Sequence, residues 1–279
     1  MSTTADSLRS LSTLPGIAEA TEAARGACTQ LRWHEGLRRR VPEAAAESRV
    51  RGARASAALD GAEMDLALVR DLMRGATPWP SRPDPLEDVL RGAVQATTES
   101  EHIRATVLTA PSQALARVHA AAAAHLLPES QVGRPRQGGE VSLEFSDLGP
   151  SPDELVVRER LSGVVEILLC ASQSSALVVA ALVHAEIATV RPFVRGNGLV
   201  ARAMERAIIQ ASGMDPTGVA VVELGHDAGG PAYLGALVAY GTGSPQGVAV
   251  WITHCAGAIV AGAQEGSRIA DAVLAGRLT

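Results

Sequence analysis

Apolar residues recur three and four positions apart along most of this chain, which is the pattern of amphipathic α-helices. The pattern predicts helices over most of residues 1–50, Ser56–Arg74, Leu86–Leu127, Glu154–Cys170, Ser175–Val190, a segment starting at Leu199, Tyr233–Tyr240 and Val248–Leu274. Ser151 and Asp153 are candidate caps for the helix that follows them. The segment Ser175–Val190 is apolar nearly all round, so we expect it at the centre of the fold.

A different pattern lies between residues 133 and 152, where Gly, Pro and polar residues surround a short alternating stretch. Val141, Leu143 and Phe145 alternate with polar residues there, which predicts a short strand or hairpin. Four prolines within Gly75–Pro85 interrupt the helical pattern and mark a candidate boundary. We therefore predict a mainly α fold with one β-hairpin, divided into an N-terminal helical extension (residues 1–85) and a main domain (residues 86–279).

The amino-acid composition excludes several classes of function. Of 279 residues, 47% are hydrophobic, and the net charge is -5 with only 3% aromatic residues. Affinity for a phosphate backbone needs excess basic charge, and single strands need aromatic platforms, so we expect no nucleic-acid partner. All 25 basic residues are Arg. The absence of Lys excludes Schiff-base chemistry and a phosphate loop built around Lys.

Cysteine spacing and hydropathy indicate the compartment. Cys28, Cys170 and Cys255 are far apart and form no metal-ligand spacing, which favours reduced, structural thiols. The first ten residues lack the pattern of a signal peptide. The most apolar segment, Leu161–Val190, contains charged and polar residues, as a buried helix pair does and a membrane span does not. We expect a cytoplasmic protein without a membrane partner.

The candidate chemistry lies in the loop RPFVRGNG, residues 191–198, which joins the central helix to an amphipathic one. Gly196 and Gly198 flank Asn197, the sole Asn of the chain. Glycines allow positive φ angles and leave backbone N–H groups open, and the following helix adds its positive end. Together these features predict an anion site, although an ordinary turn would use the same residues.

Here the sequence resembles the Fic (Fido-domain) family, whose members typically transfer AMP from ATP to a protein hydroxyl. The family signature reads His-Pro-Phe, any residue, Asp or Glu, Gly-Asn-Gly-Arg, two residues, Arg. The matching residues are Pro192, Phe193, Gly196, Asn197, Gly198 and Arg202. The resemblance covers roughly residues 86–265 and implies a Fic fold, in which Val141, Ser142 and Leu143 belong to a hairpin flap that aligns a partner protein segment.

A second resemblance lies upstream. Ser56, Asp60 and Gly61 match the inhibitory helix of many family members, which carries Ser or Thr, three residues, Glu, then Gly or Asn. In those relatives the Glu pairs with the second signature Arg and prevents productive binding of the ATP γ-phosphate. The resemblance implies an Asp60–Arg202 ion pair here; the alternative is that Asp60 has no such role.

Three departures from the signature change the expected chemistry. Arg191 replaces the His that serves as general base, and an Arg cannot accept the proton. Arg195 replaces the acidic ligand of the metal, so Mg²⁺ is doubtful. Leu199 replaces the first phosphate-binding Arg. Ordinary AMP transfer is therefore not expected, unless His184, or His226 with Asp227, supplies another base.

Charge counting suggests a retained function. Arg191, Arg195 and Arg202 sum to +3, as do the acidic ligand, Mg²⁺ and two arginines of the family site. We expect them to crowd the positive end of a helix, where a phosphate or carboxylate would relieve their repulsion. The hypothesis is metal-independent binding of ATP, another nucleotide or a phosphorylated small molecule. The alternatives are a relic pocket, a transferase of altered chemistry, and an interaction module that pairs a partner strand with the flap.

Overall fold

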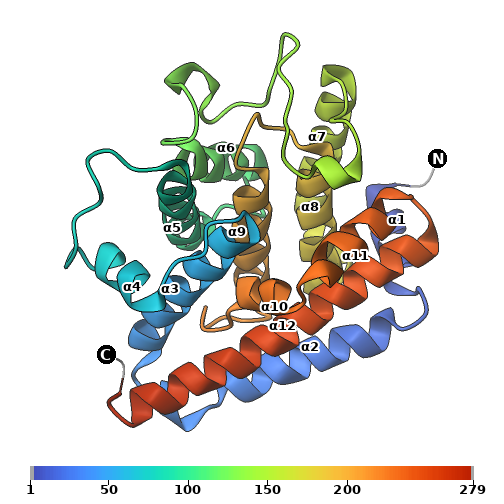
Figure 1. The fold of residues 1–279 in the computed structure, drawn as a ribbon. Helices are drawn as coiled ribbons and strands as arrows, with labels where there is room; N and C mark the ends of the chain where they lie inside the picture. The colour runs from blue at the N-terminus through green and yellow to red at the C-terminus, as the bar shows by residue number, and fades with distance from the viewer. Residues whose placement is uncertain (1–2, 278–279) are drawn as a thin grey trace.

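A computed structural model describes residues 3–277. They form α-helices that are connected by loops and short 3-10 turns (Figure 1). The N-terminal helices are α1 (Thr4–Ser12), α2 (Ile17–Arg32), α3 (Val41–Leu59) and α4 (Leu66–Met73), with the 3-10 turn η1 (Glu35–Leu37). The others are α5 (Pro85–Ile103), α6 (Pro111–Ala123), α7 (Glu154–Leu169), α8 (Ala176–Val190), α9 (Asn197–Ala211), α10 (Val222–Ala228), α11 (Pro231–Gly241) and α12 (Pro245–Leu274). Three further 3-10 turns are η2 (Glu129–Gln131), η3 (Ser146–Leu148) and η4 (Ala171–Gln173).

The prediction of a mainly helical chain is confirmed, with two adjustments to helix limits. The predicted helix Ser56–Arg74 is interrupted after α3, because Gly61 adopts a φ of 88° and turns the chain before α4 begins. The predicted block Leu86–Leu127 is two helices, α5 and α6, and the second begins at Pro111. Asp153 caps α7 by accepting a hydrogen bond from the Val156 N–H at 2.9 Å.

The predicted β-hairpin is wrong: none of residues 3–277 forms a strand. Residues 141–143 do alternate between buried and exposed, but the apolar side chains are the exposed ones, which is the reverse of a strand packed on a core. Val141 and Leu143 are 59% and 85% exposed, whereas Ser142 is buried. Phe145 then bends the backbone with a φ of 50°. The segment lies as an irregular loop whose polar side chains face inward, because their partners are the polar groups of loop 191–198 rather than a second strand.

Helices α8 and α9 lie side by side at the centre of the fold (Figure 1). The prediction for Ser175–Val190 is confirmed, since nearly every residue of α8 is buried and Ser175 caps its first turn. The long helix α12 crosses beneath them, and its Trp251 indole N–H donates to the Ala181 carbonyl of α8 at 2.6 Å. These helices fix the ends of loop 191–198 in the interior.

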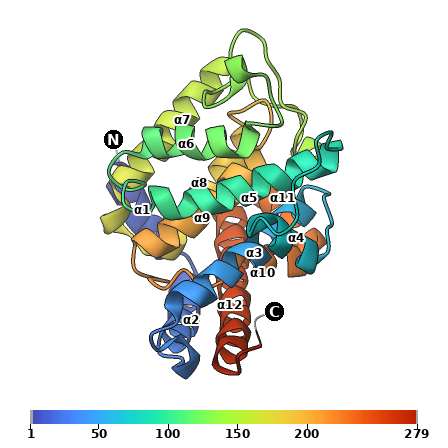
Figure 2. The ribbon, with the colours of Figure 1, turned by 90° about the vertical axis from the view of Figure 1, so that its left-hand side faces the viewer.

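The N-terminal helices pack against the rest of the chain. Helix α2 runs along α12, and α3 lies against α5 and α10 (Figures 1 and 2). The predicted boundary between residues 85 and 86 falls at the start of α5, after a loop. This arrangement brings the end of α3, with Ser56 and Asp60, to the start of α9.

Helix α12 is long and apolar enough to cross a membrane by length and composition. Half of its most apolar window is buried inside the structure. Length and hydropathy are therefore weak grounds for a membrane span.

The contact between α10 and α12 requires glycine. A Cβ atom added at Gly225 would lie 2.1 Å from the Ala258 carbonyl oxygen, which belongs to the backbone and cannot rotate away. We expect Gly225→Ala to lower the free energy of unfolding by about 3 kcal/mol, the upper range for overpacking. Urea denaturation measures this change. Gly257→Ala on α12, where an added Cβ meets open space, is the matched control and should be neutral or stabilising.

Candidate anion-binding site

The loop 191–198 presents backbone N–H groups at the start of α9. Helix α8 ends at Val190, and Arg191 follows it with a φ of 50°. Gly196 precedes α9 with a φ of 85°, a conformation that favours glycine. The N–H groups of Gly196 and Asn197 therefore point out of the turn at the positive end of the helix.

Asn197 holds this turn in shape. Its buried side chain accepts a hydrogen bond from the Phe193 N–H at 2.9 Å through Oδ1. Its Nδ2 donates to the Phe193 carbonyl at 2.9 Å and to the Ser142 hydroxyl at 3.2 Å. The single Asn of the chain thus fixes the loop and ties it to the inward-facing side of segment 141–145.

A carboxylate of the chain itself lies at the predicted anion site. Glu144 Oε1 accepts from the Gly196 N–H at 2.6 Å, and Oε2 accepts from the Asn197 N–H at 2.8 Å and from Asn197 Nδ2 at 2.7 Å. Burial and the nearby negative charge of Asp60 raise the pKa of Glu144, although these donors favour its ionised form. Glu144 was not predicted as a site residue, because its position falls within the predicted strand.

The second signature arginine is bound by the end of α3. Arg202 donates through Nε to the Ser56 hydroxyl at 2.8 Å, and through Nη2 to the Ser56 carbonyl and Asp60 Oδ1, both at 2.9 Å. The structure therefore contains the ion pair that the resemblance implied. Burial lowers the pKa of Arg202, but the negative charge of Asp60 outweighs burial and the net shift is upward. Arg202 Nη1 has no well-aligned hydrogen-bond partner among residues 3–277, and Gly198 lies beside it.

Arg191 differs from the expectation that three arginines share the anion site. It is buried, and its guanidinium donates to backbone carbonyls of the loop between residues 144 and 150 and to Thr189. The loop acceptors are the carbonyls of Glu144 and Phe145, each at 3.3 Å, and of Gly149 and Pro150, each at 2.8 Å. Arg191 is therefore committed to holding the loop that carries Glu144, and of the three arginines only Arg195 has an exposed side chain.

A cavity of about 250 Å³ adjoins this arrangement. Asp60, Glu144 and Arg195 contribute its charged side chains. Its other lining residues are Leu59, Val89, Leu126, Phe145 and Leu199. The Arg195 side chain is exposed, so it is free to meet a ligand entering from solvent. Leu199, at the position of the family's first phosphate-binding Arg, is buried and apolar and supplies no charge.

The alternative bases do not reach this cavity. His184 is fully buried, with Glu205 at 2.5 Å from Nδ1 and the Tyr233 hydroxyl at 2.8 Å from Nε2. His226 is equally buried and contacts Glu205 and His254. Both nitrogens of each ring are engaged by neighbouring side chains. His184, His226 and Asp227 are all absent from the lining of the cavity.

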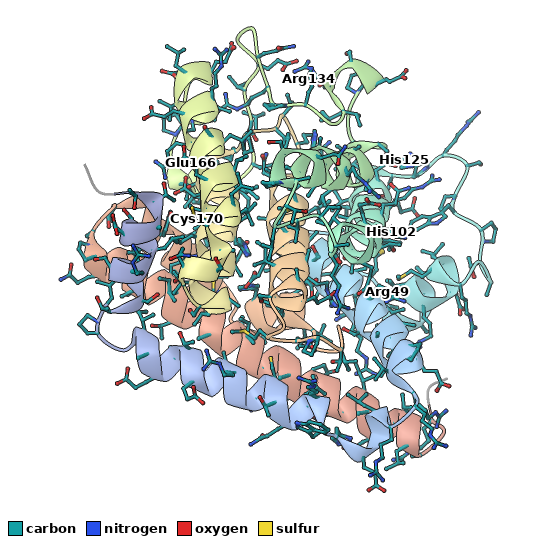
Figure 3. The ribbon with its side chains drawn as sticks, turned by 180° about the vertical axis from the view of Figure 1, so that it is seen from behind. Arg49, His102, His125, Arg134, Glu166 and Cys170 are labelled. Atoms are coloured by element: carbon teal, nitrogen blue, oxygen red, sulfur yellow. The ribbon has the colours of Figure 1, made fainter. Side chains whose placement is uncertain are left out.

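The flap segment is held by two further arginines. Arg134, labelled in Figure 3, forms a bidentate ion pair with Glu140 at 2.8 Å. Arg136 donates to the carbonyls of Val190 and Arg191 at the end of α8, and its own N–H bonds the Pro192 carbonyl at 2.8 Å. These contacts hold the 134–140 end of the loop that brings Glu144 to α9.

His119 supports the same loop from α6. Its Nδ1 accepts from the Gly133 N–H at 3.0 Å, its Nε2 lies 3.2 Å from the Arg195 carbonyl, and its ring stacks on Phe193. Burial lowers the pKa of His119 from its usual 6.5 to about 4, and the Arg134 charge adds to this effect. Because the folded pKa lies below the unfolded one, the neutral form stabilises the fold.

That shift predicts a pH dependence. The stability contributed by neutral His119 is complete above pH 6.5 and is lost as the pH falls through about 4. His119→Gln keeps a donor and an acceptor but does not titrate. Between these pH values, the wild type should lose up to about 3 kcal/mol more unfolding free energy than the variant, as urea titrations at each pH would show. Parallel curves for the two proteins would contradict the assignment.

Solved structures share this arrangement of helices. Fic-1 from C. elegans aligns with a TM-score of 0.67 at 18% identity, over 93% of this chain and 73% of that one. A single-substitution variant of that protein aligns with a TM-score of 0.64 at 18% identity, over 87% and 70%. A Fic domain-containing signaling protein from Bacteroides thetaiotaomicron has a TM-score of 0.64 at 10% identity, over 90% and 98%. This chain has the Fic fold.

No protein-family model and no curated protein sequence matches the chain. At 10–18% identity, the Fic fold is what the structural likeness shows. Within this Fic fold, loop 191–198 joins the two central helices α8 and α9. The C-terminal end of α3 and the segment 141–145 both contact this region. The geometry around that loop is the basis for a function.

Proposed function

We propose that this chain is a Fic-family protein that binds the phosphate of a nucleotide, or another phosphorylated small molecule, at the start of α9. The proposal includes neither a metal requirement nor ordinary AMP transfer. ATP is the reference nucleotide because the resembling family uses it.

One observation carries the proposal: the Glu144 carboxylate is bound by the N–H groups of Gly196 and Asn197. Two aligned backbone donors at a helix start are the arrangement that binds phosphate oxygens in other proteins. A site that already holds a carboxylate of its own chain has the geometry to hold an external anion in its place.

Two arginines near the site could bind an anion once a ligand displaces the carboxylates of Glu144 and Asp60. The guanidinium of Arg202 lies one turn along α9, and Arg195 lines the cavity. The residue at the position of the family's acidic metal ligand is Arg195, and a guanidinium cannot coordinate Mg²⁺. The donors of this loop therefore do not fit the metal that the family uses, and we assign it no step.

The same geometry provides no general base for transfer to a hydroxyl. Arg191 keeps its proton at any ordinary pH, and its donors are engaged by loop carbonyls. A ligand could therefore bind without the proton transfer that AMP transfer requires. We propose binding, with regulation of a partner protein as its consequence.

Two carboxylates control access in this proposal. Glu144 occupies the N–H groups, and Asp60 neutralises Arg202. The remaining cavity of about 250 Å³ is below the roughly 300–1,000 Å³ of typical ligand sites. A phosphorylated ligand would displace Glu144 from the N–H groups and then meet Arg195 and the unpaired Nη1 of Arg202.

Calorimetric titration with ATP, ADP and pyrophosphate, each in EDTA and in Mg²⁺, tests the proposal. We expect binding that persists in EDTA and weakens about tenfold in Arg195→Ala, equivalent to about 1.4 kcal/mol. Arg158→Ala, which removes an exposed arginine from α7, is the matched control and should bind as the wild type does. Absence of binding by all three probes, or equal binding by Arg195→Ala, would reject the anion site.

A labelling experiment tests the second part of the proposal. ATP labelled at the α-phosphate should leave no covalent label on the protein or on proteins of a cell extract. Label that depends on this chain and is lost in Arg202→Ala would instead support a transferase of altered chemistry.

A further inference from the structure

Three helices each place one metal-ligating side chain at a common point in the core, away from loop 191–198. His184 comes from α8, Glu205 from α9 and His226 from α10. One ligand atom of each lies within 4.8 Å of the others, and all three side chains are at most 1% exposed. The two histidines were predicted only as separate alternative bases, and their meeting at one carboxylate was not predicted.

A single carboxylate oxygen joins the two imidazoles. Glu205 Oε2 lies 2.5 Å from His184 Nδ1 and 2.8 Å from His226 Nε2. The other oxygen, Oε1, is buried and has no hydrogen-bond partner among residues 3–277. An orphaned carboxylate oxygen in the core is costly, and this cluster therefore contains an unused acceptor.

Glu205 also lacks a permanent positive partner. Its side chain is buried, and the only groups among residues 3–277 close enough to pair with its charge are the two imidazoles. The two arginines of the same helix are engaged elsewhere: Arg202 pairs with Asp60, and Arg206 with Glu223 at 2.7 Å. A buried negative charge without a cation is unfavourable, and a divalent cation would neutralise it.

We propose that His184, Glu205 and His226 form a buried zinc site. Two imidazole nitrogens and a carboxylate are ligands that Zn²⁺ commonly takes, and Glu205 Oε1 is available as a fourth donor. The site clamps α8, α9 and α10 together. It is separate from the proposed anion site and does not depend on that function.

The far ring nitrogens are placed as zinc-binding histidines require. His184 Nε2 is 2.8 Å from the Tyr233 hydroxyl, and His226 Nδ1 is 3.1 Å from His254 Nε2. In the zinc form, each neutral imidazole carries its proton on the far nitrogen and donates it to that partner. The near nitrogens then direct lone pairs at the ion, so zinc replaces the hydrogen bonds to Glu205 without loss of a proton from either ring.

To accept the ion, the cluster must open around Glu205 and draw the two imidazole nitrogens together, since its ligand atoms lie within 4.8 Å of one another. Ligand atoms about 2.0–2.1 Å from a tetrahedral zinc are about 3.3 Å apart. The two contacts to Glu205 Oε2 would lengthen by roughly half an ångström or more from 2.5 and 2.8 Å. Because the cluster is closed to solvent, we expect zinc to enter during folding and to exchange slowly afterwards.

Metal content of untagged protein, expressed with zinc and purified in EDTA, tests the site. We expect about one zinc per chain, released only when guanidinium unfolds the protein. Glu205→Gln keeps the size of the side chain but should lose the zinc. His119→Gln, which alters a buried histidine outside the cluster, is the matched control and should retain it.

A second measurement covers the case in which Glu205→Gln fails to fold. Wild-type protein expressed with Co²⁺ should show the visible absorption of tetrahedral cobalt with nitrogen and oxygen ligands, and should lose it on unfolding. Wild-type protein with no zinc, and whose midpoint of thermal unfolding does not rise after refolding with zinc, would overturn the proposal. Zinc retained by a folded Glu205→Gln variant would also overturn it.

Discussion

Replacing Glu144 with alanine should tighten binding of pyrophosphate about 30-fold, which corresponds to about 2 kcal/mol. In the wild type, a ligand must break the charged hydrogen bonds of Glu144 to the N–H groups of Gly196 and Asn197. Each such bond contributes about 1.5–3 kcal/mol, and a bound anion recovers most of that energy. In the variant, the N–H groups of Gly196 and Asn197 have no internal carboxylate bound to them, so pyrophosphate binds without having to displace one. Calorimetric titration in EDTA measures the change.

The control for this prediction is Asp147→Ala. Asp147 is an exposed acidic residue of the same loop, and its removal changes the net charge by the same amount. It should raise affinity by less than about threefold, the effect of one screened surface charge. If the Glu144→Ala and Asp147→Ala affinities rose equally, general electrostatics would explain both, and occupation of the site by Glu144 would be irrelevant.

Replacing Arg191 with alanine should lower the free energy of unfolding by about 3 kcal/mol, because the backbone carbonyls that it binds lose their donor and a buried polar group left unsatisfied costs about 1–3 kcal/mol. Its guanidinium connects the end of α8 to four carbonyls of the loop between residues 144 and 150. Without it, those carbonyls need water, and the loop loses its attachment. Urea denaturation measures the stability, and hydrogen exchange should show faster exchange in residues 144–150.

A second substitution distinguishes a structural role of this position from the role of the signature His. Arg191→His restores the residue of the family signature, yet it should destabilise nearly as much, since an imidazole cannot reach four carbonyls. Arg158→Ala, the exposed control, should change stability by less than about 0.5 kcal/mol. An Arg191→Ala protein as stable as the wild type would show that the loop is held by other contacts, such as those of Arg136.

Much of the fold could be predicted from the sequence because helix signals are local. The all-apolar Ser175–Val190 and the Asp153 cap each depend on a few adjacent residues, and both predictions agree with the structure. The hairpin failed for the opposite reason. Alternation identifies two faces of an extended segment but does not say which face is buried, and here the buried face carries Ser142 and Glu144.

The candidate site was predictable only where a motif fixed it. Gly196, Asn197 and the Asp60–Arg202 pair followed from resemblance to known motifs, and the structure places them together. Glu144 and Arg191 required knowledge of a contact across about fifty residues of chain. Charge counting could not supply that contact, because the sum of charges does not say which guanidinium faces the cavity and which faces backbone carbonyls.

The small cavity beside Arg195 has a kinetic consequence. Since Glu144 and Phe145 line its 250 Å³, the nucleotide of the proposed function would enter after their loop had moved outward. Association would then have two stages, opening followed by capture. As the ligand concentration rises, the observed rate of binding should level off at the opening rate instead of increasing in proportion. The protein would therefore respond to the persistence of its ligand more than to a brief rise in its concentration.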